Sequence, residues 1–290
     1  MSNNNNANLQ ELKKDAQYYK SLSDQGDLEA TYEYAMMLRH GKTIEANKPE
    51  AARLLKKCAD EGHIKSMFYY SDMTFNHDGI PQNKEEAAKY AKMAADHDYS
   101  DAIFNYAVYL RDGDGVAQNY DESLKYMRKA MDMGNINAIY GYAYLNHEGI
   151  GVPKNLQEAN KYAKIAADKG QPQAMITYAH SLLSGDGILI NIPESIKYFK
   201  MAADSSFDEG IIEYGTILLT GQYGVQKDMK EAAKYFQKGV DNGNKECMFY
   251  LAGMMLRGFG VKMDAKEACK LYKKSADLGL RDSMYNYAQC

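Results

Sequence analysis

The sequence predicts an all-α solenoid, in which antiparallel helix pairs of one kind repeat along the chain. The first observation is a column of small residues spaced 36 apart, with one step of 37: Ala30, Ser66, Ala102, Ala138, Ala174, Gly210, Cys247 and Ser283. The second is a composition of 25 tyrosines with no tryptophan, which is expected when one aromatic position is copied many times. Self-similarity at this period indicates repeats that stack to bury a continuous core.

The first helix of each repeat is predicted from an apolar face followed by a glycine. Within residues 28–40, Ala30, Tyr34 and Leu38 follow the spacing of one helical face. A second small column lies five residues after the first: Ala35, Ser71, Ala107, Ala143, Ala179, Gly215, Ala252 and Ala288. Glycines such as Gly113 and Gly115 then supply the left-handed conformations that a helix end and its turn require.

The second helix is predicted to begin at an Asn or Asp. Asn83, Asn155 and Asp228 each precede a helical pattern with acids in its first turn, so their side chains can accept hydrogen bonds from exposed backbone N–H groups. A tyrosine and an alanine four residues apart, such as Tyr198 and Ala202, share one face. One such hairpin cannot cover its own apolar faces, so neighbouring repeats must stack.

The charge and the cysteines restrict the partners and the compartment. With 35 basic and 39 acidic residues the net charge is −4, so the chain lacks the cationic surface that nucleic acid or an anionic membrane requires. We find no apolar segment typical of a secretory signal or a membrane span. Cys58, Cys247, Cys269 and Cys290 form no Cys-x-x-Cys pair, which favours a cytoplasmic, reduced compartment, with Cys247 and Cys269 filling small-residue columns.

No group of residues in the sequence predicts catalysis, a cofactor or a metal site. The glycine turns follow helices rather than strands, unlike nucleotide-binding loops. Asp112 and Asp114 lack the further ligands of a calcium loop, and the six histidines include no pair on one helical face. We therefore expect a protein that is not an enzyme and has no cofactor or metal.

The residues from Ala138 to Gly170 resemble one unit of the Sel-one-like repeat family, which is related to tetratricopeptide repeats. Gly149-Ile150-Gly151-Val152, then Asn155, Ala159, Tyr162, Ala166-Ala167 and Gly170, stand at the spacing of that family. The resemblance implies a right-handed superhelix whose first helices line a concave surface. Some secreted members use disulfides that bridge helices, but the cysteine spacings here differ from that pattern.

The resemblance covers nearly the whole chain and sets the expected boundaries. We expect a disordered polar tail over 1–8, a capping helix over 9–26, and seven repeats over 27–62, 63–98, 99–134, 135–170, 171–206, 207–243 and 244–279. Residues 280–290 begin an eighth first helix without its partner. We therefore expect a longer natural chain, or an end that docks against a partner or self-associates through this helix.

The first helices have a second face, which we call the groove columns: the positions two, six and nine residues after the first small residue. Position two is apolar or aromatic in every repeat, whereas positions six and nine vary. Together the columns are aromatic and mildly basic in the first half of the chain and aliphatic in the second. The predicted partner-binding residues are Tyr32, Met36, Arg39, Phe68, Asp72, Phe75, Phe104, Val108, Arg111, Tyr140, Tyr144, His147, Ile176, His180 and Leu183. The columns continue through Ile212, Thr216, Leu219, Phe249, Gly253 and Leu256.

We expect Phe68, Phe104, Tyr140 and Tyr144 to anchor a peptide or a partner helix, with Arg39 and Arg111 contacting its acidic or backbone groups. The alternative is that neighbouring first helices bury the position-two residues against each other. The family resemblance implies a non-catalytic adaptor in ubiquitin-linked degradation or signalling. Two alternatives are the regulatory arm of a kinase or ligase chain that continues beyond Cys290, and, more remotely, a β-lactam hydrolase.

Overall fold

The computed structural model describes residues 15–41 and 44–290, and it divides into an N-terminal unit, Met1–Tyr142, and a C-terminal unit, Ala143–Cys290. The described residues form helices and no strand, so the predicted all-α solenoid of antiparallel helix pairs is confirmed. The predicted disordered tail, and the first part of the capping helix, lie outside the described residues. The rest of the capping segment is helical over 15–24.

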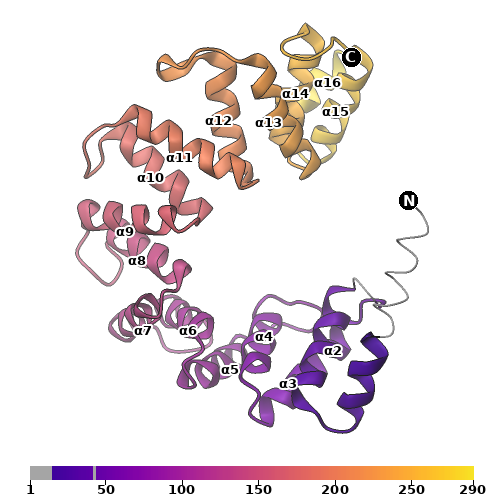
Figure 1. Cartoon of the computed structure of the whole chain (residues 1–290), viewed down its shortest axis with the longest axis vertical. Coiled ribbons are helices and arrows are strands. Elements are labelled where there is room, and N and C mark those ends of the chain that lie inside the picture. Colours follow the sequence, from indigo (N-terminus) through magenta and orange to yellow (C-terminus); the bar gives the residue numbers. More distant parts are fainter. Residues whose placement is uncertain (1–14, 42–43) are drawn as a thin grey trace. The chain divides into compact units, whose positions relative to one another are not determined.

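The helices follow one another with nearly constant length (Figure 1). The N-terminal unit contains α2 (Leu28–His40), α3 (Lys48–Asp60), α4 (Ile64–Phe75), α5 (Lys84–Asp96), α6 (Ser100–Asp112) and α7 (Tyr120–Asp132), and the unit boundary falls within α8 (Ile136–Glu148). The C-terminal unit contains α9 (Leu156–Asp168), α10 (Pro172–Ser184), α11 (Ile192–Asp204), α12 (Asp208–Thr220), η1 (Gln222–Gly224), α13 (Met229–Asp241), α14 (Lys245–Arg257), α15 (Ala265–Asp277) and α16 (Arg281–Ala288).

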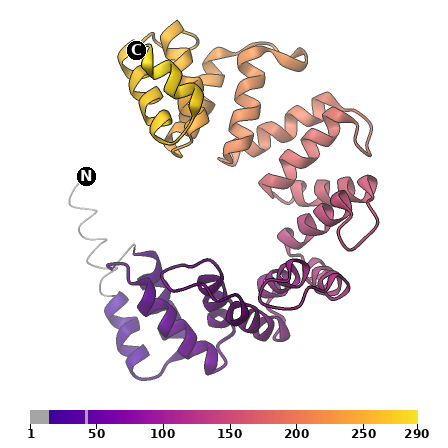
Figure 2. The same ribbon diagram turned by 180° about the vertical axis from the view of Figure 1, so that it is seen from behind.

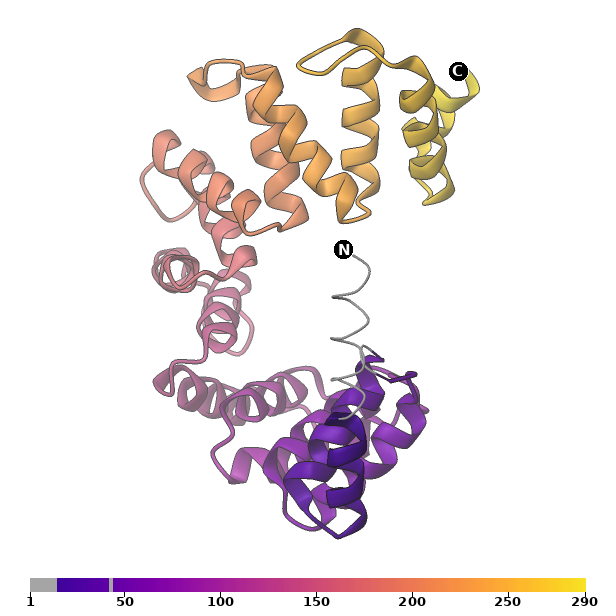
Figure 3. The same cartoon turned by 45° about the vertical axis from the view of Figure 1, so that its right-hand side comes forward.

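Each helix packs against the next one in the chain, from α2 to α7 and from α9 to α16. This succession is visible from behind in Figure 2, and Figure 3 shows the helices from α12 to α15 side by side. In the C-terminal unit, the first helices α10, α12 and α14 also contact one another in sequence order. From α10 to α14, the first helices of this unit therefore form a continuous row.

The small-residue columns mark the places where helices approach closely. Ala102 and Ala107 are completely buried. A methyl group added at Gly210 would collide with Ala202 of the preceding helix, and one added at Gly215 would stand 2.9 Å from the ring of Phe236. The 36-residue column is thus a consequence of backbone-to-backbone packing between neighbouring helices.

Local capping interactions set the helix starts that the sequence predicted. The side chains of Asn83, Asn155 and Asp228 each accept a hydrogen bond from the backbone N–H three residues later, at 3.0, 3.0 and 2.9 Å. The second glycine of several turns has another role, because its backbone packs onto the preceding repeat. A methyl group at Gly115 would collide with the carbonyl of Lys84, and one at Gly260 with the carbonyl of Met229.

The copied tyrosine of the second helix links consecutive repeats. The Tyr198 hydroxyl donates to Asp168 at 2.5 Å, and Lys164 donates to the Tyr198 hydroxyl at 3.1 Å. Tyr235 donates to Asp204 at 2.7 Å, in the same position of the next repeat. Burial and the neighbouring Asp168 carboxylate raise the pKa of Tyr198 to about 12, so the hydroxyl stays a donor at neutral pH.

We expect Tyr198→Phe to lower the free energy of unfolding by about 1 kcal/mol, because it removes a charge-assisted hydrogen bond and leaves the ring packing in place. The measurement is urea denaturation followed by circular dichroism. Tyr285→Phe is the control, because the Tyr285 side chain is exposed on α16. Equal midpoints for both variants would show that the tyrosine is retained for its ring alone.

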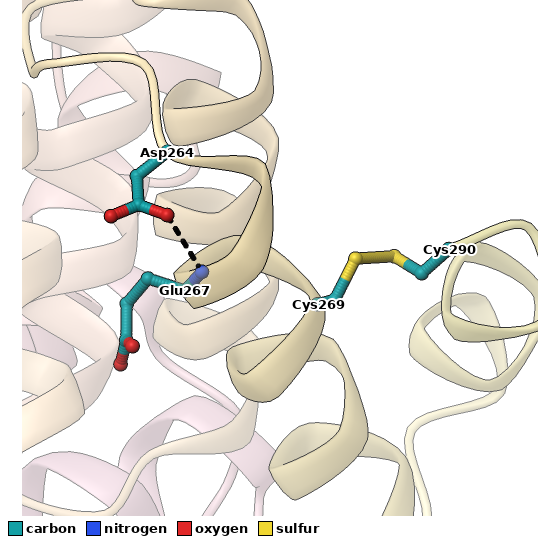
Figure 4. The surroundings of a disulfide bond; sticks show 4 residues. All are labelled: Asp264, Glu267, Cys269 and Cys290. Atoms are coloured by element: carbon teal, nitrogen blue, oxygen red, sulfur yellow. Dashed lines mark hydrogen bonds between the residues drawn. A yellow bond between two sulfur atoms is a disulfide. The ribbon is translucent and has the colours of Figure 1, made fainter.

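The structure corrects the prediction for two of the four cysteines. Cys269 on α15 forms a disulfide with Cys290, just after α16, and the two Cα atoms are 5.8 Å apart (Figure 4). The pair was missed because 21 residues separate its members in the sequence. Disulfides are typical of oxidising compartments, so the cysteines no longer support the cytoplasmic prediction.

Cys58 and Cys247 are buried free thiols. Burial raises the pKa of the Cys247 thiol to about 12, and its sulfur fills the space that the missing side chain of Gly239 leaves. Cys247 therefore packs as a small apolar residue, as predicted. Among the described residues, no helix has the length and apolar content needed to cross a membrane.

Candidate partner-binding groove

The position-two residues of the groove columns lie largely between neighbouring first helices. Tyr32 is only 8% exposed, and its ring lies 5.7 Å from that of Tyr69. Phe68 is half-buried, with its ring 5.2 Å from that of Tyr99. Ile176 is 3% exposed. Tyr32 and Ile176 are therefore buried within the chain, which leaves little of either side chain for a partner to contact.

The basic side chains of the N-terminal unit are already paired within the chain. Arg39 forms ion pairs with Asp72 and with Asp78, the latter at 2.8 Å, and its side chain is only 14% exposed. Burial would by itself lower the pKa of Arg39, but the two carboxylates raise it. Arg111 forms a two-point ion pair with Asp112 at 2.6 and 2.7 Å. Both arginines, predicted to contact acidic or backbone groups of a partner, are thus held by carboxylates of the chain itself.

The other predicted groove residues differ in exposure. Met36, Phe75, Phe104, Val108, Tyr140, His147 and Leu183 are half-buried. Phe75 stacks on Tyr109 with the ring centroids 4.7 Å apart. Tyr144 is 43% exposed, and His180 is exposed with its ring nitrogen 3.6 Å from Glu213. The two exposed members of the predicted set, Tyr144 and His180, thus both occupy position six of a first helix and lie in the C-terminal unit.

In the C-terminal unit, the last two repeats open a pocket of about 560 Å³. The groove-column residues Leu219, Phe249, Gly253 and Leu256 line it together with Thr220, Lys227, Met229, Tyr250, Met254, Arg257, Phe259, Tyr272, Asn286 and Gln289. Helices α12 and α14 supply the groove columns, while α15 and α16 supply Tyr272 and the two amides. Four groove-column residues from the aliphatic half of the columns therefore line the pocket.

The floor of the pocket depends on a glycine. A methyl group at Gly253 would stand 3.3 Å from Nη1 of Arg257 and 3.4 Å from the hydroxyl of Tyr272, so the missing side chain exposes both groups. The Tyr272 ring is 3% exposed and contacts Phe249 edge-on, with centroids 5.9 Å apart. Burial raises the pKa of Tyr272, an effect that nearby Arg257 partly offsets, so the hydroxyl stays protonated at neutral pH.

Sequence reasoning missed Tyr272 and Arg257, although a signal was present. Tyr272 occupies a column that is otherwise apolar: Leu55, Ala91, Met127, Ala163, Phe199 and Phe236. A single hydroxyl in a buried column is unusual, and its repeat is also the one with glycine at position six. The two substitutions occur together and create one opening.

The helix pairs and their glycine turns correspond to a known repeat profile. The Sel1 repeat profile matches residues 28–63, 64–99, 100–135, 136–171, 172–207, 209–244 and 245–280. The chain belongs to the Sel1 repeat family. Its matched Sel1 repeats begin one or two residues after the boundaries that we placed from the sequence. Sel1 repeat chains are helical scaffolds that typically bind proteins and are generally non-catalytic.

Solved structures with the Sel1 fold resemble the chain at low identity. A Sel1 repeat protein from Oxalobacter formigenes has a TM-score of 0.72 and 22% identity, over 94% of this chain and 79% of that one. The protective antigen c5321 of uropathogenic Escherichia coli has a TM-score of 0.63 and 22% identity over 93% of this chain, which spans 58% of the antigen. The immunity protein PA5088 from Pseudomonas aeruginosa has a TM-score of 0.55 and 19% identity, over 74% of this chain and 81% of that one. No curated protein matches the chain significantly. These structural likenesses show the fold.

Within residues 15–41 and 44–290, no group of three or more His, Cys, Asp or Glu side chains is placed to hold a metal ion. The site that the structure presents is a pocket with an apolar wall, two basic side chains and a tyrosine hydroxyl that opens onto it. Such a combination, with a few polar groups in an apolar cleft, is typical of a binding site.

Proposed function

We propose that the chain is a non-catalytic scaffold that binds a peptide or a helix of a partner protein along its groove columns. The observation that carries this proposal is the pocket between α12, α14, α15 and α16, because four groove-column residues line it. Varied residues on a constant helical framework are how repeat proteins achieve partner specificity. Leu256 and Phe259 are 37% and 41% exposed at the pocket, and large apolar side chains of this kind often carry the binding energy of an interface.

The pathway is part of the proposal and rests on the family resemblance alone. We propose an adaptor role in a multiprotein complex, of which ubiquitin-linked degradation and signalling are the examples that the family suggests. Self-association through α16 is a second proposal, supported by Met284, Tyr285 and Tyr287, which are exposed on that helix.

A photo-crosslinking experiment tests the groove directly. The crosslinking amino acid p-benzoylphenylalanine replaces Tyr144 or Leu256, which are exposed groove positions, or Lys161 or Lys234, which are exposed on second helices. We expect partner adducts from lysate at the two groove positions and not at the two second-helix positions. Adducts at Lys161 and Lys234 alone would place the binding surface on the second helices and overturn the proposal. If the chain self-associates through α16, p-benzoylphenylalanine in place of Tyr285 is expected to give a crosslinked dimer of the chain.

A further inference from the structure

We propose that the pocket of the C-terminal unit binds an acidic side chain of an extended partner peptide, held by Arg257, Lys227 and the hydroxyl of Tyr272, beside an apolar residue of the same peptide. This inference rests on the proposed function and deepens it by naming the chemistry of the partner. It is carried by three features of the pocket: its charge, its tyrosine hydroxyl and its apolar wall.

The charge of the pocket is opposite to that of the chain. The chain has a net charge of −4, yet Lys227 and Arg257 line the pocket and no Asp or Glu does. Neither basic side chain forms an ion pair with an acid in the part of the chain that the structure describes. Arg257 Nη1 donates to the carbonyl of Gly253 at 3.1 Å, which holds the guanidinium over the glycine and leaves its other N–H groups for a carboxylate.

The Tyr272 hydroxyl supplies the second donor. Nine-tenths or more of the side chain is buried, its oxygen faces the space above Gly253, and none of the described residues makes a hydrogen bond with it. The hydroxyl opens onto the pocket, so a group bound there can accept a hydrogen bond from it. Repeats five and six have Phe199 and Phe236 at this position, so the packing does not require the oxygen. A carboxylate above Gly253 would accept from both Tyr272 and Arg257.

The remaining walls suit an extended peptide. Leu219, Phe249, Leu256 and Phe259 form the apolar part, and Asn286 of α16 and Gln289 just after it carry amides that can both donate to and accept from a peptide backbone. A volume of about 560 Å³ falls within the range of small-ligand pockets and admits a few residues rather than a whole helix. The occupant is therefore an acidic residue with a large apolar neighbour.

The test uses the full chain and two matched libraries of fluorescent heptapeptides, acetylated and amidated at their ends. The centre is fixed as Glu in one library and as Gln in the other, and the flanking positions vary among Leu, Phe, Ile, Val, Tyr and Ala. Fluorescence anisotropy measures the affinity. We expect the best Glu peptides to bind at least about 10-fold more tightly than their Gln counterparts, because an ionised carboxylate accepts charge-assisted hydrogen bonds from Arg257 that are stronger than those of a neutral amide.

Four variants assign the preference to the pocket. Arg257→Gln is expected to abolish the preference for Glu, and Tyr272→Phe to reduce it several-fold, while Arg281→Gln and Tyr285→Phe, both outside the pocket, leave it unchanged. Gly253→Val fills the floor and is expected to abolish binding of both libraries. The fold accepts larger residues at this position in other repeats, as Val108 and Thr216 show. Gly253→Ala is the smaller alternative if the valine variant melts early.

Each other outcome is decisive. If Glu and Gln peptides bind equally and Gly253→Val abolishes both, the acidic chemistry is wrong and the peptide-binding groove stands. If peptides bind only when their carboxyl end is left free, the occupant is a chain terminus and the inference fails. If neither library binds the unchanged chain, this pocket is not a peptide site, and the adducts at Tyr144 and Leu256 alone decide the proposed function.

Discussion

Gly260→Ala is expected to lower the free energy of unfolding of the last repeats by more than about 3 kcal/mol, whereas Gly258→Ala in the same turn is expected to cost only about 1 kcal/mol. Both glycines have left-handed backbone angles, with φ of 71° and 66°. A methyl group at Gly258 would lie no closer than 3.7 Å to its neighbours. One at Gly260 would collide with the carbonyl of Met229 and the backbone nitrogen of Lys230.

The difference follows from what each methyl group would meet. The backbone at the start of α13 cannot move aside as a flexible side chain can, because its N–H and C=O groups belong to the helix. The variant must therefore separate α13 from the turn after α14. Urea denaturation of both variants, followed by circular dichroism, measures the two costs. Equal midpoints would mean that the turn glycines are retained for their backbone angles alone, and that the contact between repeats contributes nothing.

Removing the Cys269–Cys290 disulfide is expected to increase amide hydrogen exchange in α16 by about 100-fold. The bond joins residues 21 apart, and closing a loop of this size stabilises by about 3 kcal/mol in the chain-entropy description. The buried side chain of α16 is Ser283, which pairs with Ser275 at 2.6 Å. Without the disulfide, the helix opens from its neighbour far more often.

The measurement compares the unchanged chain with a Cys269→Ser, Cys290→Ser variant by hydrogen–deuterium exchange mass spectrometry. Exchange in α10, away from the bond, is the internal control and is expected to stay the same. Because Asn286 and Gln289 line the pocket, the variant is also expected to bind the peptides more weakly. Unchanged protection of α16 would show that side-chain packing holds the helix without the disulfide.

The helix pairs could be predicted because the interactions that define them are local. The Asn83 cap accepts from a backbone N–H only three residues away. Gly113 ends α6 because its own backbone has a left-handed φ, which glycine adopts readily. The stacking of repeats could be predicted as well, since Gly210 and Ala202 must be small wherever two helix backbones approach this closely. A 36-residue period records the same packing many times.

The groove could be predicted only as a face. Tyr32 and Tyr144 both lie in groove columns, yet Tyr32 is covered by the next first helix and Tyr144 is 43% exposed. Their exposure depends on the residues that neighbouring helices present to them. Arg39 could not be predicted as paired either, because Asp72 and Asp78 come from the following repeat.

The sequence by itself determined the family and the helix pairs, because each depends on contacts within one repeat or on a spacing that recurs in every repeat. Only the tertiary structure decided the disulfide and the pocket. Cys290 bonds to Cys269, and Tyr272 lies beside Gly253 and Arg257, because the helices that carry them pack against each other in the folded chain. Such contacts occur once and between different elements, so no periodic pattern in the sequence records them.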